Sequence, residues 1–142
     1  MFKTILVATD GSGAGDLALA YAKELAVDQK ARLLVVHVDE LVPGHGGAHH
    51  VQALEPEIKT RIGEQVTAFK AAGLQVDFEV HKVTLSGPAH AIADAATAAT
   101  ADLIVLGSVG SGPLKGLLLG SVAHRLLQIA PCPVLVVPAK DR

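Results

Sequence analysis

The sequence has very few aromatic residues, one cysteine and no long apolar run. Aromatic side chains make up 3% of the 142 residues, so we expect an aliphatic core. A single cysteine, Cys132, excludes an internal disulfide and is typical of a reducing cytoplasm. Because no stretch of about 18 apolar residues occurs, we expect no membrane span. The short apolar start MFKTILVATDGS is predicted to be a strand and not a signal peptide.

An excess of charge of either sign is also lacking. The net charge is −2, so there is no basic surface of the kind that binds nucleic acid, and we expect no nucleic-acid partner. Half of the residues are hydrophobic and 18% are charged, which excludes a disordered chain. The length suits one core, so we expect a single domain over residues 1–142.

Short runs rich in Val, Ile and Leu alternate with longer segments of helical periodicity. We expect strands at residues 3–9, 32–38, 75–84, 102–106 and 133–138, and helices at residues 16–29, 53–72, 89–99 and 121–130. This alternation predicts an α/β fold with right-handed crossovers, a mainly parallel sheet and helices on both faces. Residues 75–84 alternate apolar and polar side chains, which indicates an edge strand. Residues 39–51 are expected to form an irregular loop.

Two loops compete for the place where such sheets bind ligands, beyond the carboxyl ends of the strands at the point where the strand order reverses. One loop, residues 10–15, follows the first strand. The other, residues 107–119, follows the fourth strand and belongs to the glycine-rich stretch GSVGSGPLKGLLLGS. Glycine is costly to order, so its abundance here indicates that the backbone must approach something closely.

Standard catalytic motifs are absent from this stretch. No Gly-Lys-Ser/Thr triplet of a P-loop occurs, and Lys115 stands where a GxGxxG fingerprint needs its third glycine. No GxSxG elbow is formed, and the segment after Asp10 lacks the second aspartate of an aspartyl-phosphate enzyme. We therefore expect a protein that is not an enzyme. A slow ATPase or another nucleotide-dependent enzyme on the same scaffold is the alternative.

The glycine spacing is Gly107-x2-Gly110-x9-Gly120-Ser121. Backbone amides exposed by the first two glycines can form a nest for phosphate oxygens. Gly120-Ser121 starts the last predicted helix, whose free amides and positive dipole end also favour an anion. The spacing therefore predicts two half-sites that grip a polyphosphate. A flexible loop followed by an ordinary serine cap is the simpler alternative.

At these residues the chain resembles the universal stress protein (UspA-like) family, in its ATP-binding branch with the motif G-2x-G-9x-G-(S/T). The resemblance covers nearly the whole chain, including KTILVATDGS, LLVVHVDE, ADLIVLGS and LLLGSVAHRLLQIAPCPVLVVP. It implies an adenine nucleotide alpha-hydrolase-like fold with strand order 3-2-1-4-5. It also implies a stress-response regulator or sensor that binds ATP, ADP or AMP, together with Mg²⁺ or Mn²⁺.

Carried over residue by residue, the resemblance implies a nucleotide site. The backbone at Ala8 and Val38 would hold the adenine, and Asp10 would lie near the ribose or the divalent cation. The phosphate and ribose loop would consist of Gly107, Ser108, Val109, Gly110, Ser111, Gly112 and Pro113, closed by Gly120, Ser121, Val122 and Ala123. Many relatives carry Arg or His where this chain has Val109, so a charged donor is missing. Asp10 has a second interpretation, as a cap of the turn into the first helix.

The histidines and the cysteine offer further candidate sites. His45, His49 and His50 could bind zinc or nickel, although a glycine-rich loop does not fix ligand geometry. His37 matches a family position near the pocket, but we interpret it as a packed core histidine. The other histidines, residues 81, 90 and 124, are expected on the surface. Cys132 is expected to be a small buried hydrophobe.

The last predicted strand, Pro133–Pro138, is apolar along its length. At a sheet edge this strand would expose unpaired backbone groups and hydrophobic side chains, which soluble proteins avoid. Pairing with the same strand of a second copy would cover it, and the resemblance implies the same homodimer. A dimeric interaction module that binds no nucleotide remains an alternative function. The sequence names no regulated partner protein.

Overall fold

The computed structural model describes residues 1–40, 46–83, 87–108 and 120–139, with five strands and four helices in that part of the chain. The strands are β1 (Thr4–Ala8), β2 (Arg32–Glu40), β3 (Val76–Val83), β4 (Leu103–Gly107) and β5 (Val134–Val137). The helices are α1 (Gly13–Gln29), α2 (Gly46–Ala71), α3 (Pro88–Ala99) and α4 (Ser121–Ile129). Strands and helices alternate as the sequence predicts.

All neighbouring strands are parallel, and their order is β3-β2-β1-β4-β5. This confirms the α/β fold with strand order 3-2-1-4-5 and places β3 at an edge, as its alternating pattern predicts. The chain moves outward from β1 to β2 and β3, then crosses over to β4 and β5 on the other side. The strand order therefore reverses between β1 and β4.

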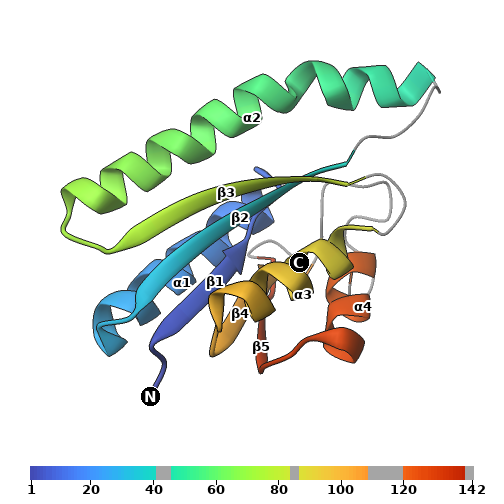
Figure 1. Cartoon of the computed structure of the whole chain (residues 1–142). Helices are drawn as coiled ribbons and strands as arrows, with labels where there is room; N and C mark the ends of the chain where they lie inside the picture. The colour runs from blue at the N-terminus through green and yellow to red at the C-terminus, as the bar shows by residue number, and fades with distance from the viewer. Residues whose placement is uncertain (41–45, 84–86, 109–119, 140–142) are drawn as a thin grey trace.

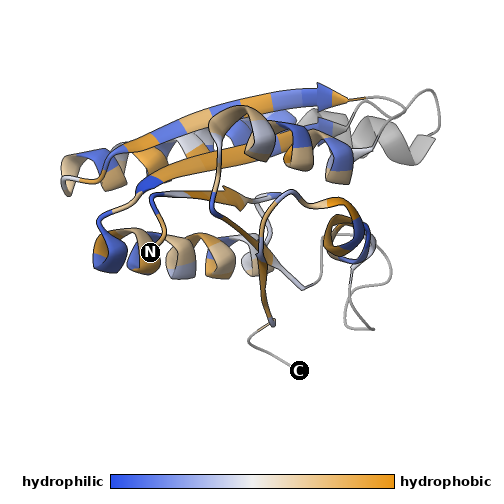
Figure 2. Cartoon of the chain, turned by 60° about the horizontal axis from the view of Figure 1, so that its bottom comes forward, coloured by the Kyte–Doolittle hydropathy of each residue, from blue (hydrophilic) through white to orange (hydrophobic). Residues whose placement is uncertain are grey.

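Two hydrophobic cores lie on the two faces of the sheet. Ile5 and Val7 of β1 point to the face covered by α1 and α2, whereas Leu6 between them points to the face covered by α3 and α4. Figure 1 shows α2 lying along β3, away from α3 and α4. In Figure 2 the edge strand β3 alternates between hydrophilic and hydrophobic residues, whereas its neighbour β2 is mostly hydrophobic. Burial on both faces is what makes the inner strands continuously apolar.

The expectation of an irregular loop at residues 39–51 is wrong at both of its ends. β2 continues to Glu40 because its pairing with β3 extends as far as Glu40 opposite Val83. α2 begins at Gly46, earlier than the predicted start at residue 53, and contains Pro56. The helix includes Gly46 and Gly47, whose propensity favours a loop, and Pro56, which has no N–H to donate to residue 52, so its early start does not follow from the local sequence. Residues 41–45 lie outside the described residues.

Candidate functional site

The two loops that compete for the ligand position in the sequence begin at neighbouring points of the structure. Val7 of β1 is level with Val105 of β4. The turn after β1 and Ser108 after β4 therefore leave the sheet at adjacent points of the same edge. This edge is the topological switch point, where open α/β sheets bind ligands.

The turn between β1 and α1 is organised by its own side chains. Asp10 Oδ1 accepts hydrogen bonds from the backbone N–H and the hydroxyl of Ser12. Ser12 is the N-cap of α1, and its Oγ accepts from the N–H of Gly15 at 3.1 Å. Gly11 adopts a φ of 80°, which favours glycine. The predicted capping role of Asp10 is thus confirmed for the turn, while its ligand role stays a prediction.

Gly107, the last residue of β4, packs closely against the start of α1. A β-carbon on Gly107 would lie 3.1 Å from the carbonyl oxygen of Ala14. The absence of a side chain therefore lets the strand end approach the first turn of α1. This is a structural reason for a glycine that the sequence alone assigns to ligand binding.

The described residues on either side of the glycine-rich loop, Ser108 and Gly120, are hydrogen-bonded to each other. The N–H of Gly120 donates to the carbonyl oxygen of Ser108 at 2.6 Å, and the N–H of Ser108 donates to Val137 of β5 at 2.9 Å. The first bond holds the start of α4 beside the end of β4. The predicted loop residues Val109, Gly110, Ser111, Gly112 and Pro113 lie outside the described residues.

The start of α4 differs from an ordinary serine cap. Gly120 is the N-cap, no side chain caps the helix, and Ser121 is its first helical residue. The alternative of a serine cap at Ser121 is therefore wrong. Ser121 is exposed and Val122 is half-buried, whereas the side chain of Ala123 is buried in the core. Ala123 can reach a ligand only through its backbone.

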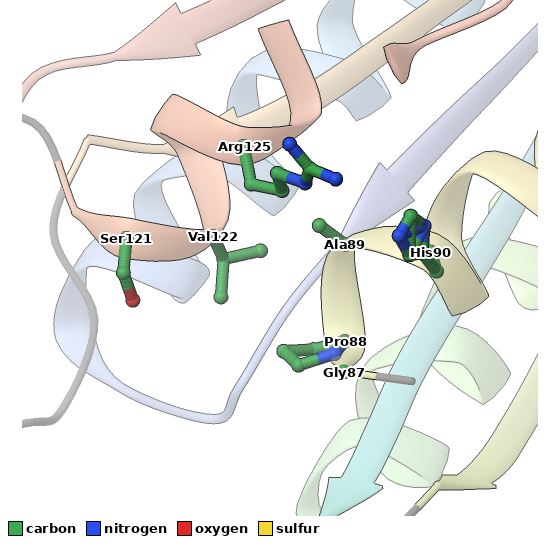
Figure 3. A pocket seen from close by; sticks show the side chains of 7 residues that line it. All are labelled: Gly87, Pro88, Ala89, His90, Ser121, Val122 and Arg125. Carbon is green, nitrogen blue, oxygen red and sulfur yellow. The ribbon is translucent and has the colours of Figure 1, made fainter. Parts of the chain in front are cut away.

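A hollow of about 130 Å³ lies between the first turns of α3 and α4 (Figure 3). It is lined by Gly87, Pro88, Ala89, His90, Ser121, Val122 and Arg125. Figure 3 shows Ser121 and Val122 at the start of α4, with Arg125 one turn further along. His90, expected on the surface, is half-buried there and lines the hollow. Sequence reasoning missed Arg125, although a spacing of four from Ser121 on a helix puts both on one face.

The ends of β1 and β2, where the resemblance puts adenine, are joined by His37. Its Nδ1 lies 2.9 Å from the carbonyl oxygen of Thr9, and its Nε2 lies 2.8 Å from Oε2 of Glu55 on α2. His37 is 1% exposed, which confirms the packed core interpretation. The neighbouring Ala8 and Val38 are half-buried and pack on the opposite face of the sheet, with α3 and α4.

The structure says less about the remaining candidate residues. Cys132 is half-buried, whereas the sequence predicts a buried residue. Burial raises the pKa of its thiol, and the charge of Asp102 raises it further. Within the described ranges no group of three His, Cys, Asp or Glu residues could hold a metal ion. His45 lies outside them, and the side chains of His49 and His50 are not described, so the zinc or nickel hypothesis stays a prediction. No helix in the described part of the chain is long and apolar enough to cross a membrane.

Comparison with known proteins agrees with this geometry. The model of the universal stress protein family matches residues 1–138. A universal stress protein of Thermus aquaticus is 43% identical over 139 residues, covering 96% of this chain and 99% of the relative. The structure of UspA from Lactobacillus plantarum superposes with a TM-score of 0.80 at 25% identity, covering 95% and 97% of the two chains. A universal stress protein solved in complex with cAMP gives a TM-score of 0.67 at 29% identity, covering 98% of each chain. The chain belongs to the universal stress protein family.

Proposed function

We propose that this chain binds an adenine nucleotide at the edge of the sheet between β1 and β4, and acts as a stress-response regulator or sensor through that binding. The observation that carries the proposal is the hydrogen bond from Gly120 to Ser108, which joins the two halves of the glycine motif at the topological switch point. The solved relative in complex with cAMP supports the chemical class of the ligand.

Each part of the ligand finds a matching group. The backbones of Ala8 and Val38 offer polar groups to the adenine from the ends of adjacent strands. The uncapped amides at Ser121 and the residues after it offer donors to a phosphate. Arg125 supplies a positive charge beside them. It would replace the charged donor that is missing where this chain has Val109. Asp10 would hold Mg²⁺ or Mn²⁺, which would neutralise phosphate charge when bound.

We infer that the site holds the nucleotide without rapid turnover. Phosphoryl transfer needs positioned cations and a residue that orients the attacking group. The P-loop lysine is absent from the sequence, and the motif supplies backbone amides instead. ATP is the nucleotide that the glycine motif favours, with ADP and AMP as competitors at the same site.

Isothermal titration calorimetry with ATP, ADP and AMP tests the proposal, with Gly120→Val as the site variant. The Gly120 backbone, at φ −60° and ψ 155°, is a conformation that any residue adopts, so valine obstructs the approach of phosphate without backbone strain. We expect wild type to bind and the variant to lose binding while its circular dichroism spectrum stays that of the folded protein, with a Tm lowered only by the poorer N-cap. Absence of binding by wild type would contradict the proposal.

We also propose that residues 1–142 act as one cytoplasmic domain that forms a homodimer through residues 133–138. In the described part of the chain β5 pairs with β4 alone, and its Leu135 is 37% exposed. Light scattering at micromolar concentration should give the mass of a dimer. Leu135→Lys should give a monomer, because a charge at the two-fold contact faces its own copy. A wild-type monomer would overturn the dimer without affecting the nucleotide proposal.

A further inference from the structure

A buried histidine and a buried glutamate connect α2 to the end of β1. His37 is 1% exposed and Glu55 is 8% exposed. The ring of His37 lies between two oxygens, with Nδ1 2.9 Å from the Thr9 carbonyl and Nε2 2.8 Å from the Glu55 carboxyl. His37 therefore fastens three elements, β1, β2 and α2, at one point.

These two contacts require one proton more than a neutral imidazole and a carboxylate possess. A carbonyl oxygen can only accept, so Nδ1 must carry a hydrogen to bond Thr9. A carboxylate also only accepts, so Nε2 needs a second hydrogen unless the carboxyl itself is protonated. When the extra proton leaves, either the Thr9 contact or the Glu55 contact loses its hydrogen bond, because a neutral ring carries one hydrogen.

His37 and Thr9, the residue that its Nδ1 contacts, are next in sequence to the backbone groups that the proposed function assigns to adenine. Thr9 stands between Ala8 and Asp10, and His37 precedes Val38. The N–H of Thr9 also donates to the carbonyl oxygen of Val36 of β2 at 3.0 Å, so both the N–H and the carbonyl of Thr9 are hydrogen-bonded. Loss of the His37 contact would leave the Thr9 carbonyl without its side-chain donor, directly beside the two strand ends.

Helix α2 makes further contacts with the same turn. The Arg61 guanidinium donates to the Gly11 carbonyl oxygen at 2.6 Å and pairs with Asp16 on α1. Ile58 lies over Gly11, where a β-carbon would come within 2.8 Å of its Cγ2. One face of α2, from Glu55 to Arg61, thus supports the turn that carries Asp10.

We propose that His37 and Glu55 are positioning residues for the nucleotide site, and that one shared proton is what keeps the ends of β1 and β2 at the spacing that adenine requires. This inference rests on the proposed function, since it concerns the affinity of that same site. Neither side chain touches the nucleotide. Nucleotide binding should consequently be tightest while both contacts of His37 hold a hydrogen, and should weaken when either contact loses it.

Other ionisable groups surround the pair and are the same in wild type and in the Glu55 variant described below. Lys59 on α2 pairs with the buried Asp39 of β2 at 2.9 Å, and Lys82 of β3 is level with Asp39. Asp16, the partner of Arg61, lies on α1, and Asp10 lies in the turn itself. Because these groups do not change, a difference between wild type and a Glu55 variant isolates the pair.

Glu55→Gln is the decisive variant. A glutamine amide can donate to Nε2 of a neutral His37 while Nδ1 keeps its hydrogen for Thr9, so both contacts persist without the extra proton. The dissociation constant for AMP should be measured for both proteins from pH 6 to pH 9. We expect wild type to lose about three- to tenfold more affinity than Glu55→Gln over this range, the equivalent of one buried hydrogen bond. Titration of AMP itself cancels in the comparison.

The matched control is Lys59→Met, which breaks the neighbouring contact between α2 and β2 but leaves His37 untouched. Its pH profile should follow wild type. Parallel profiles for wild type and Glu55→Gln, or a flattened profile for Lys59→Met, would overturn the proposal.

A second measurement does not depend on nucleotide. Hydrogen-exchange protection factors of the amides in the turn from Thr9 to Ser12 should fall with pH in wild type and stay level in Glu55→Gln. If neither protein binds nucleotide at any pH, the proposed function fails, and this exchange comparison still decides whether the pair positions the turn. Equal protection in the two proteins would refute the positioning role.

Discussion

Replacing Gly107 by alanine tests the close contact between β4 and α1. The added β-carbon would lie 3.1 Å from the carbonyl oxygen, 3.2 Å from the carbonyl carbon and 3.2 Å from the β-carbon of Ala14. Ordinary contacts of this kind are about 3.5–4.0 Å, so the strand end and the helix must separate by a few tenths of an ångström. Neither moves freely, because α1 is capped by Ser12 and Ser108 is bonded to β5.

We expect this overpacking to lower the free energy of unfolding by about 1–2 kcal/mol. For a chain of this length, that corresponds to a fall in Tm of roughly 3–8 °C. The displaced first turn of α1 is bonded to Ser12, which donates both hydrogen bonds to Asp10, so nucleotide affinity should fall as well. Urea denaturation followed by circular dichroism measures the first effect, and calorimetric titration measures the second.

Gly63→Ala is the matched control, because nothing lies within 4 Å of a β-carbon at this position in α2. Alanine is a better helix former than glycine, so this variant should gain about 0.5–1 kcal/mol. An unchanged or raised stability for Gly107→Ala, measured beside a stabilised Gly63→Ala, would refute the steric reasoning.

Three further predictions concern stability and reactivity. Gly11→Ala should lower the free energy of unfolding by about 1–2 kcal/mol, because Gly11 has a positive φ and an added β-carbon would contact Ile58. Adding Ile58→Ala should not restore stability, because the backbone strain remains. Full recovery of stability in urea denaturation would contradict this. Hydrogen bonds from the backbone N–H groups of Thr4 and Lys3 lower the pKa of Asp102, so its stabilising contribution is present above the unfolded pKa and is lost as pH falls through the folded value. Asp102→Asn should therefore reduce the acid sensitivity of Tm below about pH 4, and an identical profile would argue against it. Because burial, reinforced by Asp102, raises the pKa of Cys132, iodoacetamide should modify the folded protein more slowly than free cysteine at pH 8; an equal rate would show that the thiol is not perturbed.

Much of the fold was predictable because local pattern and burial agree in this chain. The inner strands are apolar on both faces, which only a sheet covered by two helical layers allows, and the alternation in β3 indicates its edge position. The prediction failed at residues 39–51, where local propensity indicates a loop. Pairing of β2 with β3 depends on a neighbouring strand that the local sequence does not contain, and the local sequence does not indicate that α2 starts at Gly46 instead of residue 53.

The candidate site, like the fold, has some features that the sequence predicts and others that depend on the tertiary structure. The glycine spacing and the resemblance by themselves determined the family, and they predict a site with two half-sites, since these depend on residue order and on the few residue types that tolerate close backbone approach. Only the tertiary structure decided what the individual residues do. It assigned Gly107 to packing on α1, made Gly120 the cap of α4, and brought Arg125 and His90 to one hollow. It also joined His37 to a glutamate eighteen residues away, because partners on separate elements are chosen by packing and not by sequence distance.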